Sequence, residues 1–296
     1  MRNNIRTRHR HKNKVASNKH NMNSQIRKVR NLSKFNRQPQ LPTIDEGEYL
    51  AAKILAPKIG PYLHGLSLAI NVAGHALELP PALDHATLRD SFLVSNSFLI
   101  KMMNDLRVLQ IIASKGYAIQ SATIASSLYE SSFILGYLGD DDQKSRKWIN
   151  HTDRESINSI IHGIKSLTKN AIRKQTRISG IDIDYKELGN TEYKKYQILC
   201  MAKHSNPLIQ KEHGFVYEHG TIYGEPGPEA SDAAVKLICF SLENSISFVM
   251  TGLVTYVNEH LTDYDTRHFV RLFNYTKDYY NKLKEESINR WGSENI

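Results

Sequence analysis

Cysteine is scarce in this sequence. Cys200 and Cys239 are the two cysteines among 296 residues, and both lie in stretches with helical periodicity. Two cysteines cannot form a zinc site without other ligands, and a buried free thiol behaves as a small apolar group. We therefore expect two buried, reduced thiols rather than a disulfide.

Neither a secretory signal nor a convincing membrane span is visible in the sequence. The N-terminus has no apolar core, so we expect no secretory signal and a cytoplasmic protein. The apolar run over residues 233–257 is long enough to span a membrane, but Lys236, Glu243, Asn244 and several hydroxyl side chains dilute it. A buried core helix is the better interpretation, and we expect no membrane partner.

The chain lacks the short motifs that usually identify an enzyme or a metalloprotein. There is no HExxH, no paired CxxC, no Walker A sequence and no GxGxxG after a strand. A di-metal carboxylate bundle would need more inward-facing acids than Glu130 and Glu243. We therefore expect neither a bound metal nor a cofactor.

Residues 1–44 contain no acidic side chain. They hold 12 of the 39 Lys and Arg, which leaves 27 basic and 30 acidic residues in the rest of the chain. Large apolar side chains are few in this segment, so it cannot bury enough surface to fold alone. We therefore expect a disordered basic arm, residues 1–43, followed by a helical domain, residues 44–296.

Basic arms of this kind bind phosphate backbones without needing a fold. We expect the arm to contact nucleic acid, and the alternative is a solvated tail that binds only weakly. The candidate nucleic-acid-binding residues are Arg6, Arg8, Arg10, Lys12, Lys14, Arg27, Lys28 and Arg30.

The sequence after the arm has helical periodicity throughout, and no period-two pattern competes with it. We predict an all-α, multi-helix bundle. Four glycines interrupt the pattern over residues 208–228, where a small hairpin is one interpretation. The expected helices cover 49–79 (two pieces divided near Pro57 and Pro61), 84–115 (capped by Asp84), 118–138, 145–150, 153–177, 185–204, 231–257 and 266–291.

Two acids are isolated in apolar, helix-length runs. Glu130 is the one charged side chain of residues 118–138, and Glu243 lies within residues 233–257. A carboxylate in an apolar helix is costly unless it is paired, hydrogen-bonded or protonated. We expect Glu130 to be buried beside a polar group of the helix that ends near residue 204.

These acids have a structural and a functional interpretation. The structural one is a pair of packing acids that specify how helices fit together. The functional one is a pocket lined by Glu130, Tyr196, Asn206 and Glu243.

Three residues are candidates for acid–base or phosphate chemistry. Arg146 and His151 are five apart in one predicted helix, close to one face, so both could address a single phosphate. His204 ends a predicted helix beside Asn206, where the helix dipole favours a charged imidazole. The structural alternatives are a solvated basic turn for the first pair and a dipole-stabilised helix end for His204.

Two segments also occur in an order typical of one group of proteins. Residues 121–130 (SATIASSLYE) are followed by Tyr137-Leu138, a charged turn and Arg146. The chain resembles, over roughly residues 85–260, a family of uncharacterised all-helical bacterial proteins with these segments. A later helix of the family matches Tyr196, Leu199, Cys200 and His204.

The helical layout of that family is similar to the HEPN superfamily. Active HEPN members are metal-independent ribonucleases with an Arg-x4–6-His motif, and Arg146 and His151 match this spacing. The resemblance therefore implies a ribonuclease in which His151 or His204 assists attack by the 2′-hydroxyl. Arg146 would stabilise the charge on the phosphorane.

Three functions remain open from the sequence. The leading expectation is a non-enzymatic interaction protein that engages nucleic acid through the arm, in stress or phage defence. The second is the HEPN-like ribonuclease. The third is a small-ligand sensor with Glu130 and His204 in its pocket. A homodimer also stays open.

Overall fold

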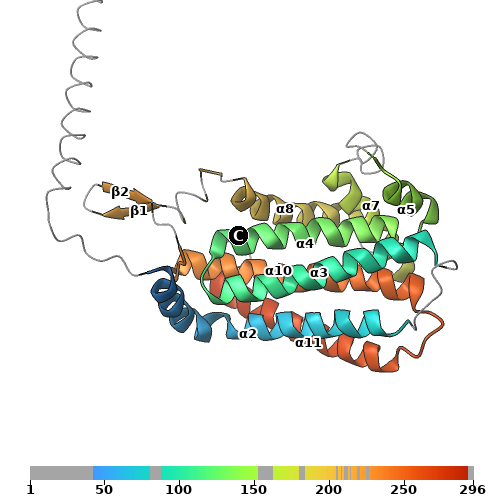
Figure 1. Cartoon of the computed structure of the whole chain (residues 1–296), viewed down its shortest axis with the longest axis horizontal. Helices are drawn as coiled ribbons and strands as arrows, with labels where there is room; N and C mark the ends of the chain where they lie inside the picture. The colour runs from blue at the N-terminus through green and yellow to red at the C-terminus, as the bar shows by residue number, and fades with distance from the viewer. Residues whose placement is uncertain are drawn as a thin grey trace, which may run out of the picture. The chain divides into compact units, whose positions relative to one another are not determined.

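The computed structural model (Figure 1) confirms the all-α class. Residues 1–42, which hold nearly all of the expected arm and its eight candidate nucleic-acid contacts, lie outside the described residues. The described residues are 43–80, 88–152, 163–179, 184–204, 206, 207, 209, 213, 215–218, 221–224 and 227–292.

Eight helices and one hairpin occupy the described part of the chain. The two short strands β1 (Phe215–Glu218) and β2 (Thr221–Gly224) pair antiparallel in the glycine-containing stretch where a hairpin was one interpretation of the sequence. The helices are α2 (Ile44–Glu78), α3 (Asp90–Ser114), α4 (Ala118–Leu138), α5 (Asp142–Ile149), α7 (Ile164–Ser179), α8 (Tyr185–Lys203), α10 (Asp232–His260) and α11 (Arg267–Trp291).

The core is built around α10, which packs against α2, α3, α4 and α11. A helix that is apolar on most sides must be covered on most sides, and Leu242, Ile246 and Leu253 are fully buried. Among the described residues, α10 is the helix long and apolar enough to cross a membrane, but 83% of its most apolar window is buried inside the bundle.

The apolar run at residues 118–138 forms α4 with the predicted bounds. Gly116 separates α4 from α3. Its φ is 94°, a backbone conformation that residues with a Cβ rarely adopt. A Cβ on Gly116 would also lie 2.7 Å from the backbone oxygen of Glu229. The turn between α3 and α4 therefore requires glycine for both its backbone angle and its packing.

The expected division of the first helix is wrong, because α2 is continuous through Pro57 and Pro61. Each proline removes a helical hydrogen bond, at a cost of about 3 kcal/mol. Leu55, Ile59 and Leu66 are fully buried beside the prolines, and each contributes about 1.5–3 kcal/mol of burial. Packing against the bundle thus offsets the proline cost, and α2 bends rather than breaks (Figure 1).

The start of α3 also differs from expectation. The helix begins at Asp90, whereas Asp84 lies outside the described residues. Its first turn is capped from another element, because Oδ1 of Asp142 accepts a 3.0 Å hydrogen bond from the backbone N–H of Ser91. This satisfies one of the free N–H groups at the helix start and joins α3 to α5.

Candidate functional site

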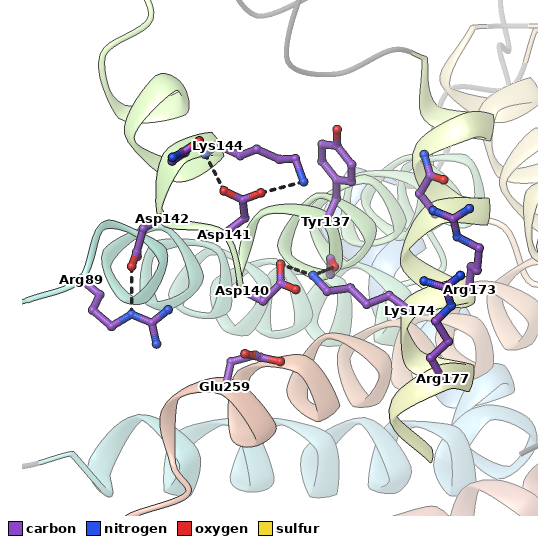
Figure 2. A pocket seen from close by; sticks show the side chains of 13 residues that line it. Arg89, Tyr137, Asp140, Asp141, Asp142, Lys144, Arg173, Lys174, Arg177 and Glu259 are labelled. Carbon is purple, nitrogen blue, oxygen red and sulfur yellow. Dashed lines mark hydrogen bonds and ion pairs between the residues drawn. The ribbon is translucent and has the colours of Figure 1, made fainter. Parts of the chain in front are cut away.

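A charged hollow of about 820 Å³ lies where α4 ends and α5 begins, beside α7 (Figure 2). Acids of residues 140–142 line one side, and cations of α7 line the other. Arg89 and Glu259 complete the charged lining. The hollow is open to solvent, and its polar lining favours a charged, water-soluble group over an apolar one.

The acidic side is built by local capping. Asp141 caps α5, accepting a 3.0 Å hydrogen bond from the backbone N–H of Lys144 and pairing with its ammonium at 2.8 Å. The side-chain bond from Lys144 lowers the pKa of Asp141. Burial alone would raise the pKa of Asp142, but hydrogen bonds from Ser91 and Arg89 outweigh it and lower the pKa to about 2. Both acids therefore stay ionised at neutral pH, and both are already paired with groups of the protein.

The basic side comes from α7, which supplies Arg173, Lys174 and Arg177 (Figure 2). Lys174 forms an ion pair with Asp140 and a 3.4 Å hydrogen bond to the carbonyl of Gly136. Within the described residues, neither arginine has a carboxylate partner, and both are exposed. The hollow thus presents two guanidinium groups that form no ion pair with a carboxylate of the described residues.

Contacts other than these charges also hold α7 in place. Gln175 donates from Nε2 to the carbonyl of Thr251 on α10 at 3.1 Å, and a Cβ on Gly136 would lie 3.2 Å from that of Ala171. The described contacts that hold α7 therefore involve residues other than the two arginines. A guanidinium presents a planar fork of donors, so the arrangement can bind a phosphate or another oxyanion.

Glu259 is the acid of this hollow whose pKa is raised. Burial is the main cause, the nearby carboxylate of Asp140 adds to it, and Lys174 and Arg89 oppose it. An incoming oxyanion would meet this acid as well as the arginines. The Arg173–Arg177 rim is therefore a better anion contact than the floor of the hollow.

The structure places Arg146 and His151 in different surroundings. Arg146 on α5 pairs with Asp90, Nε to Oδ2 at 2.7 Å, and its side chain is 72% exposed. The imidazole of His151, just after α5, bonds through Nδ1 to the carbonyl of Trp148. The two residues line separate hollows, one with Asp142 and one around Trp148.

His204 ends α8 as expected, and its backbone N–H bonds to the carbonyl of Cys200 at 3.0 Å. Its neighbour Lys203 contacts Glu130, which lies eight residues before the end of α4. That offset corresponds to about 12 Å along the helix axis, and α5 begins only beyond it. The structure therefore does not bring His204 together with Arg146 and His151.

The expected contact between Glu130 and the helix of Tyr196 is present. The hydroxyl of Tyr196 donates to Oε1 of Glu130 at 2.7 Å, and Lys203 Nζ reaches the same oxygen at 3.1 Å. The expected burial is wrong, because the Glu130 side chain is 32% exposed. The neighbouring Tyr129 takes the fully buried position instead and stacks on Tyr196, with ring centroids 4.6 Å apart.

Glu243 belongs to another part of the core. Its Oε2 accepts a 2.5 Å hydrogen bond from Ser287 on α11, and that hydroxyl is 2.8 Å from the hydroxyl of Tyr62 on α2. Burial raises the pKa of Glu243, although Ser287 and Lys195 oppose the shift. The partners of Glu243 thus differ from those of Glu130.

Asn206 lies just past α8, where its backbone N–H bonds to the carbonyl of Met201 at 2.9 Å. The four residues of the predicted pocket, Glu130, Tyr196, Asn206 and Glu243, are absent from the lining of the hollow in Figure 2. Tyr196 and Glu130 form a direct contact, whereas the hydrogen bonds around Glu243 lead to α11 and α2.

Arg89, Arg173 and Arg177 were not among the site residues predicted from the sequence. A usable signal for the last two was present, because residues 164–179 contain five Lys or Arg and no acid. Arg89 carried no such signal, since its role depends on Asp142 from a distant segment.

Among the described residues, no group of three or more His, Cys, Asp or Glu could hold a metal ion. No protein-family model, curated protein or solved structure matches the chain. The resemblance to the all-helical bacterial family and to HEPN proteins therefore rests on the sequence segments alone and stays a prediction.

Proposed function

We propose that this protein binds nucleic acid through its basic N-terminal segment, with the helical bundle as a non-enzymatic interaction domain. The observation that carries the proposal is the separation of charge along the chain. Residues 1–44 hold 12 basic and no acidic residues, while the remainder has 27 basic and 30 acidic. A polyanion is therefore attracted by the first segment and weakly repelled by the average charge of the rest.

The energetic basis is counterion release. A protein that neutralises several phosphates frees the cations condensed on them, and affinity then falls steeply with salt. This effect needs no defined fold in the basic segment. It also carries no base specificity, so we propose sequence-independent binding.

The ribonuclease alternative gains no support from the arrangement of its residues. Arg146 is neutralised by Asp90, and His151 is engaged by the carbonyl of Trp148. The sensor alternative is likewise unsupported, because neither Glu130 nor His204 lines the hollow in Figure 2. A role in stress or phage defence rests on the family resemblance alone.

The test compares the full chain with a variant in which the eight candidate arm residues are replaced by Gln. Fluorescence anisotropy with labelled RNA and duplex DNA is measured at about 50 to 200 mM salt. We expect the substitutions to abolish most binding. The slope of log K against log salt should become shallower by about 0.7–0.9 for each phosphate that the variant no longer neutralises.

A matched control exchanges Lys and Arg within the same eight positions and keeps the charge. We expect that variant to bind within about threefold of the wild type, because the interaction depends on charge. Wild-type affinity in the Gln variant would overturn the proposed function.

A further inference from the structure

A row of four cations runs along one side of α7; three of them are exposed, and the stem of the half-buried Lys169 packs against Gly189 of α8. Lys165, Lys169, Arg173 and Arg177 recur every four residues, and this helix contains no acid. Residues four apart share a helix face, so successive charges are about 6 Å apart along the axis and the row spans about 18 Å. Within the described residues, none of the four has a carboxylate partner.

This row is not explained by the stability of the bundle. Like charges four residues apart on a helix repel each other and weaken it. The helix is held instead by Leu167, Ala171 and Ile172, which are buried. Its neighbour α8 does not compensate the charge, because the two helices together carry nine Lys or Arg and two Glu.

An aromatic ring of α8 lies beside the row. The ammonium of Lys165 is 5.4 Å from the ring centroid of Tyr193, and both residues line a second open hollow with Lys169. The ring is partly exposed. At the other end of the row, Arg173 and Arg177 form the rim of the first hollow (Figure 2).

We propose that α7 together with Tyr193 is a track for single-stranded nucleic acid. The four cations contact successive phosphates, and the ring of Tyr193 stacks on one base. Cations along a groove with an exposed aromatic ring are what sequence-tolerant binding of single strands requires. A duplex keeps its bases stacked on one another, so it can use the cations but not the ring.

This inference rests on the proposed function in that the ligand is nucleic acid. It concerns a different surface, however, because the arm and α7 are separate segments of the chain. The role of the arm and the role of α7 can therefore be refuted independently, and the experiments below test each one separately.

The first test replaces the four cations of the row by Gln in the full chain. A single strand of about 20 nucleotides should bind about tenfold or more weakly, and the salt slope should fall by about 2–3, since each phosphate contact contributes about 0.7. Circular-dichroism melting should change little, because three of the four side chains are exposed and Gln keeps most of the Lys169 stem that packs on Gly189. The matched control neutralises four exposed cations on α2 and α11 and should stay within about twofold. Its positions are Lys53, Arg271, Lys277 and Lys282.

The second test separates stacking from charge. Tyr193→Leu removes the ring, whereas Tyr193→Phe keeps it. We expect the Leu variant to bind single strands about fivefold or more weakly, with no change for duplex, and the Phe variant to match the wild type.

The outcomes are distinguishable. Wild-type binding by the four-Gln row variant overturns the inference, and the proposed function stands if arm neutralisation still abolishes binding. Loss in the row variant together with full binding in the arm variant refutes the arm and supports the track. Weaker binding to phosphatidylserine vesicles with unchanged RNA binding would identify a membrane-facing surface and overturn the inference.

Discussion

The hydroxyl of Tyr196 donates a 2.7 Å hydrogen bond to Oε1 of Glu130, and the ammonium of Lys203 approaches the same oxygen. The Glu130 carboxylate on α4 therefore accepts hydrogen bonds from two side chains of α8. On the adjacent, buried position of α4, the hydroxyl of Tyr129 lies 2.6 Å from that of Thr168 on α7. These polar contacts connect α4, α7 and α8, and they help to position α7, which carries the cation row, beside α8, which carries Tyr193.

Replacement of Glu130 tests these contacts. Glu130→Gln keeps an acceptor for Tyr196 and should cost about 0.5–1.5 kcal/mol of unfolding free energy. Glu130→Leu leaves the tyrosine hydroxyl without that acceptor and should cost more, about 1–3 kcal/mol. Urea denaturation measures both. If the Leu variant were as stable as the Gln variant or more stable, the hydrogen bond from Tyr196 would not contribute to the stability of the fold.

Ser287→Ala should destabilise the protein by about 1–3 kcal/mol, because it removes a donor to the half-buried carboxylate of Glu243 and a partner of Tyr62. The free energy of unfolding from urea denaturation gives the comparison. The control Tyr62→Phe leaves the Ser287–Glu243 bond in place and should cost less.

The cost of Ser287→Ala should also depend on pH. Burial already raises the pKa of Glu243, and the Ser287 bond counteracts that rise. Its loss raises the folded-state pKa further, so the destabilisation should be larger at neutral pH, where the carboxylate is charged, than in acid. Urea melts at both conditions measure the difference, and a pH-independent cost would contradict this account.

His260 should make the protein acid-sensitive. Burial lowers the pKa of this imidazole to about 4, with a contribution from Arg89, and its Nε2 lies 3.1 Å from the hydroxyl of Ser95. The folded-state pKa lies below the usual value of about 6.5. The stabilisation is therefore present above pH 6.5 and is lost as the pH falls towards 4, by up to about 3 kcal/mol.

His260→Gln provides the comparison for this effect. The variant keeps a polar group near Ser95 but cannot take up the proton. Its unfolding free energy should decline less than that of the wild type over the same pH window. Parallel curves for the two proteins would mean that another group is responsible.

Arg146→Ala and His151→Ala should each leave the unfolding free energy within about 1 kcal/mol, because the side chain of Arg146 is largely exposed where it pairs with Asp90. We also expect no cleavage of labelled RNA by the wild type in EDTA. Cleavage that is lost in both variants, but kept in the control Lys147→Ala, would instead establish the ribonuclease.

The limits of many helices could be predicted, because the signals that start and end a helix lie in neighbouring residues. The run of residues 118–138 is bounded by Gly116 and Gly139, and α4 has those limits. Ser231 caps α10, where its hydroxyl accepts from the backbone N–H of Ala234. Such signals act within one helical turn and are visible in the sequence.

The depth of Glu130 could not be predicted in the same way. Because α4 is apolar on most sides, its periodicity does not identify which face is covered. Tyr129 and Glu130 differ by about 100° around the helix, and one is fully buried while the other is a third exposed. The continuity of α2 could not be predicted either. Pro57 and Pro61 are local signals that favour a break, whereas the packing that overrides them involves distant residues.

The sequence by itself determined the all-helical class, most helix limits and the separation of charge, since each is a property of composition or of adjacent residues. Tertiary structure decided the partners: Asp142 caps α3, Ser287 bonds to Glu243, and Arg173 and Arg177 remain without a carboxylate among the described residues. These relationships join groups far apart in the chain. They depend on which helix faces meet, and many packings can bury the same apolar side chains.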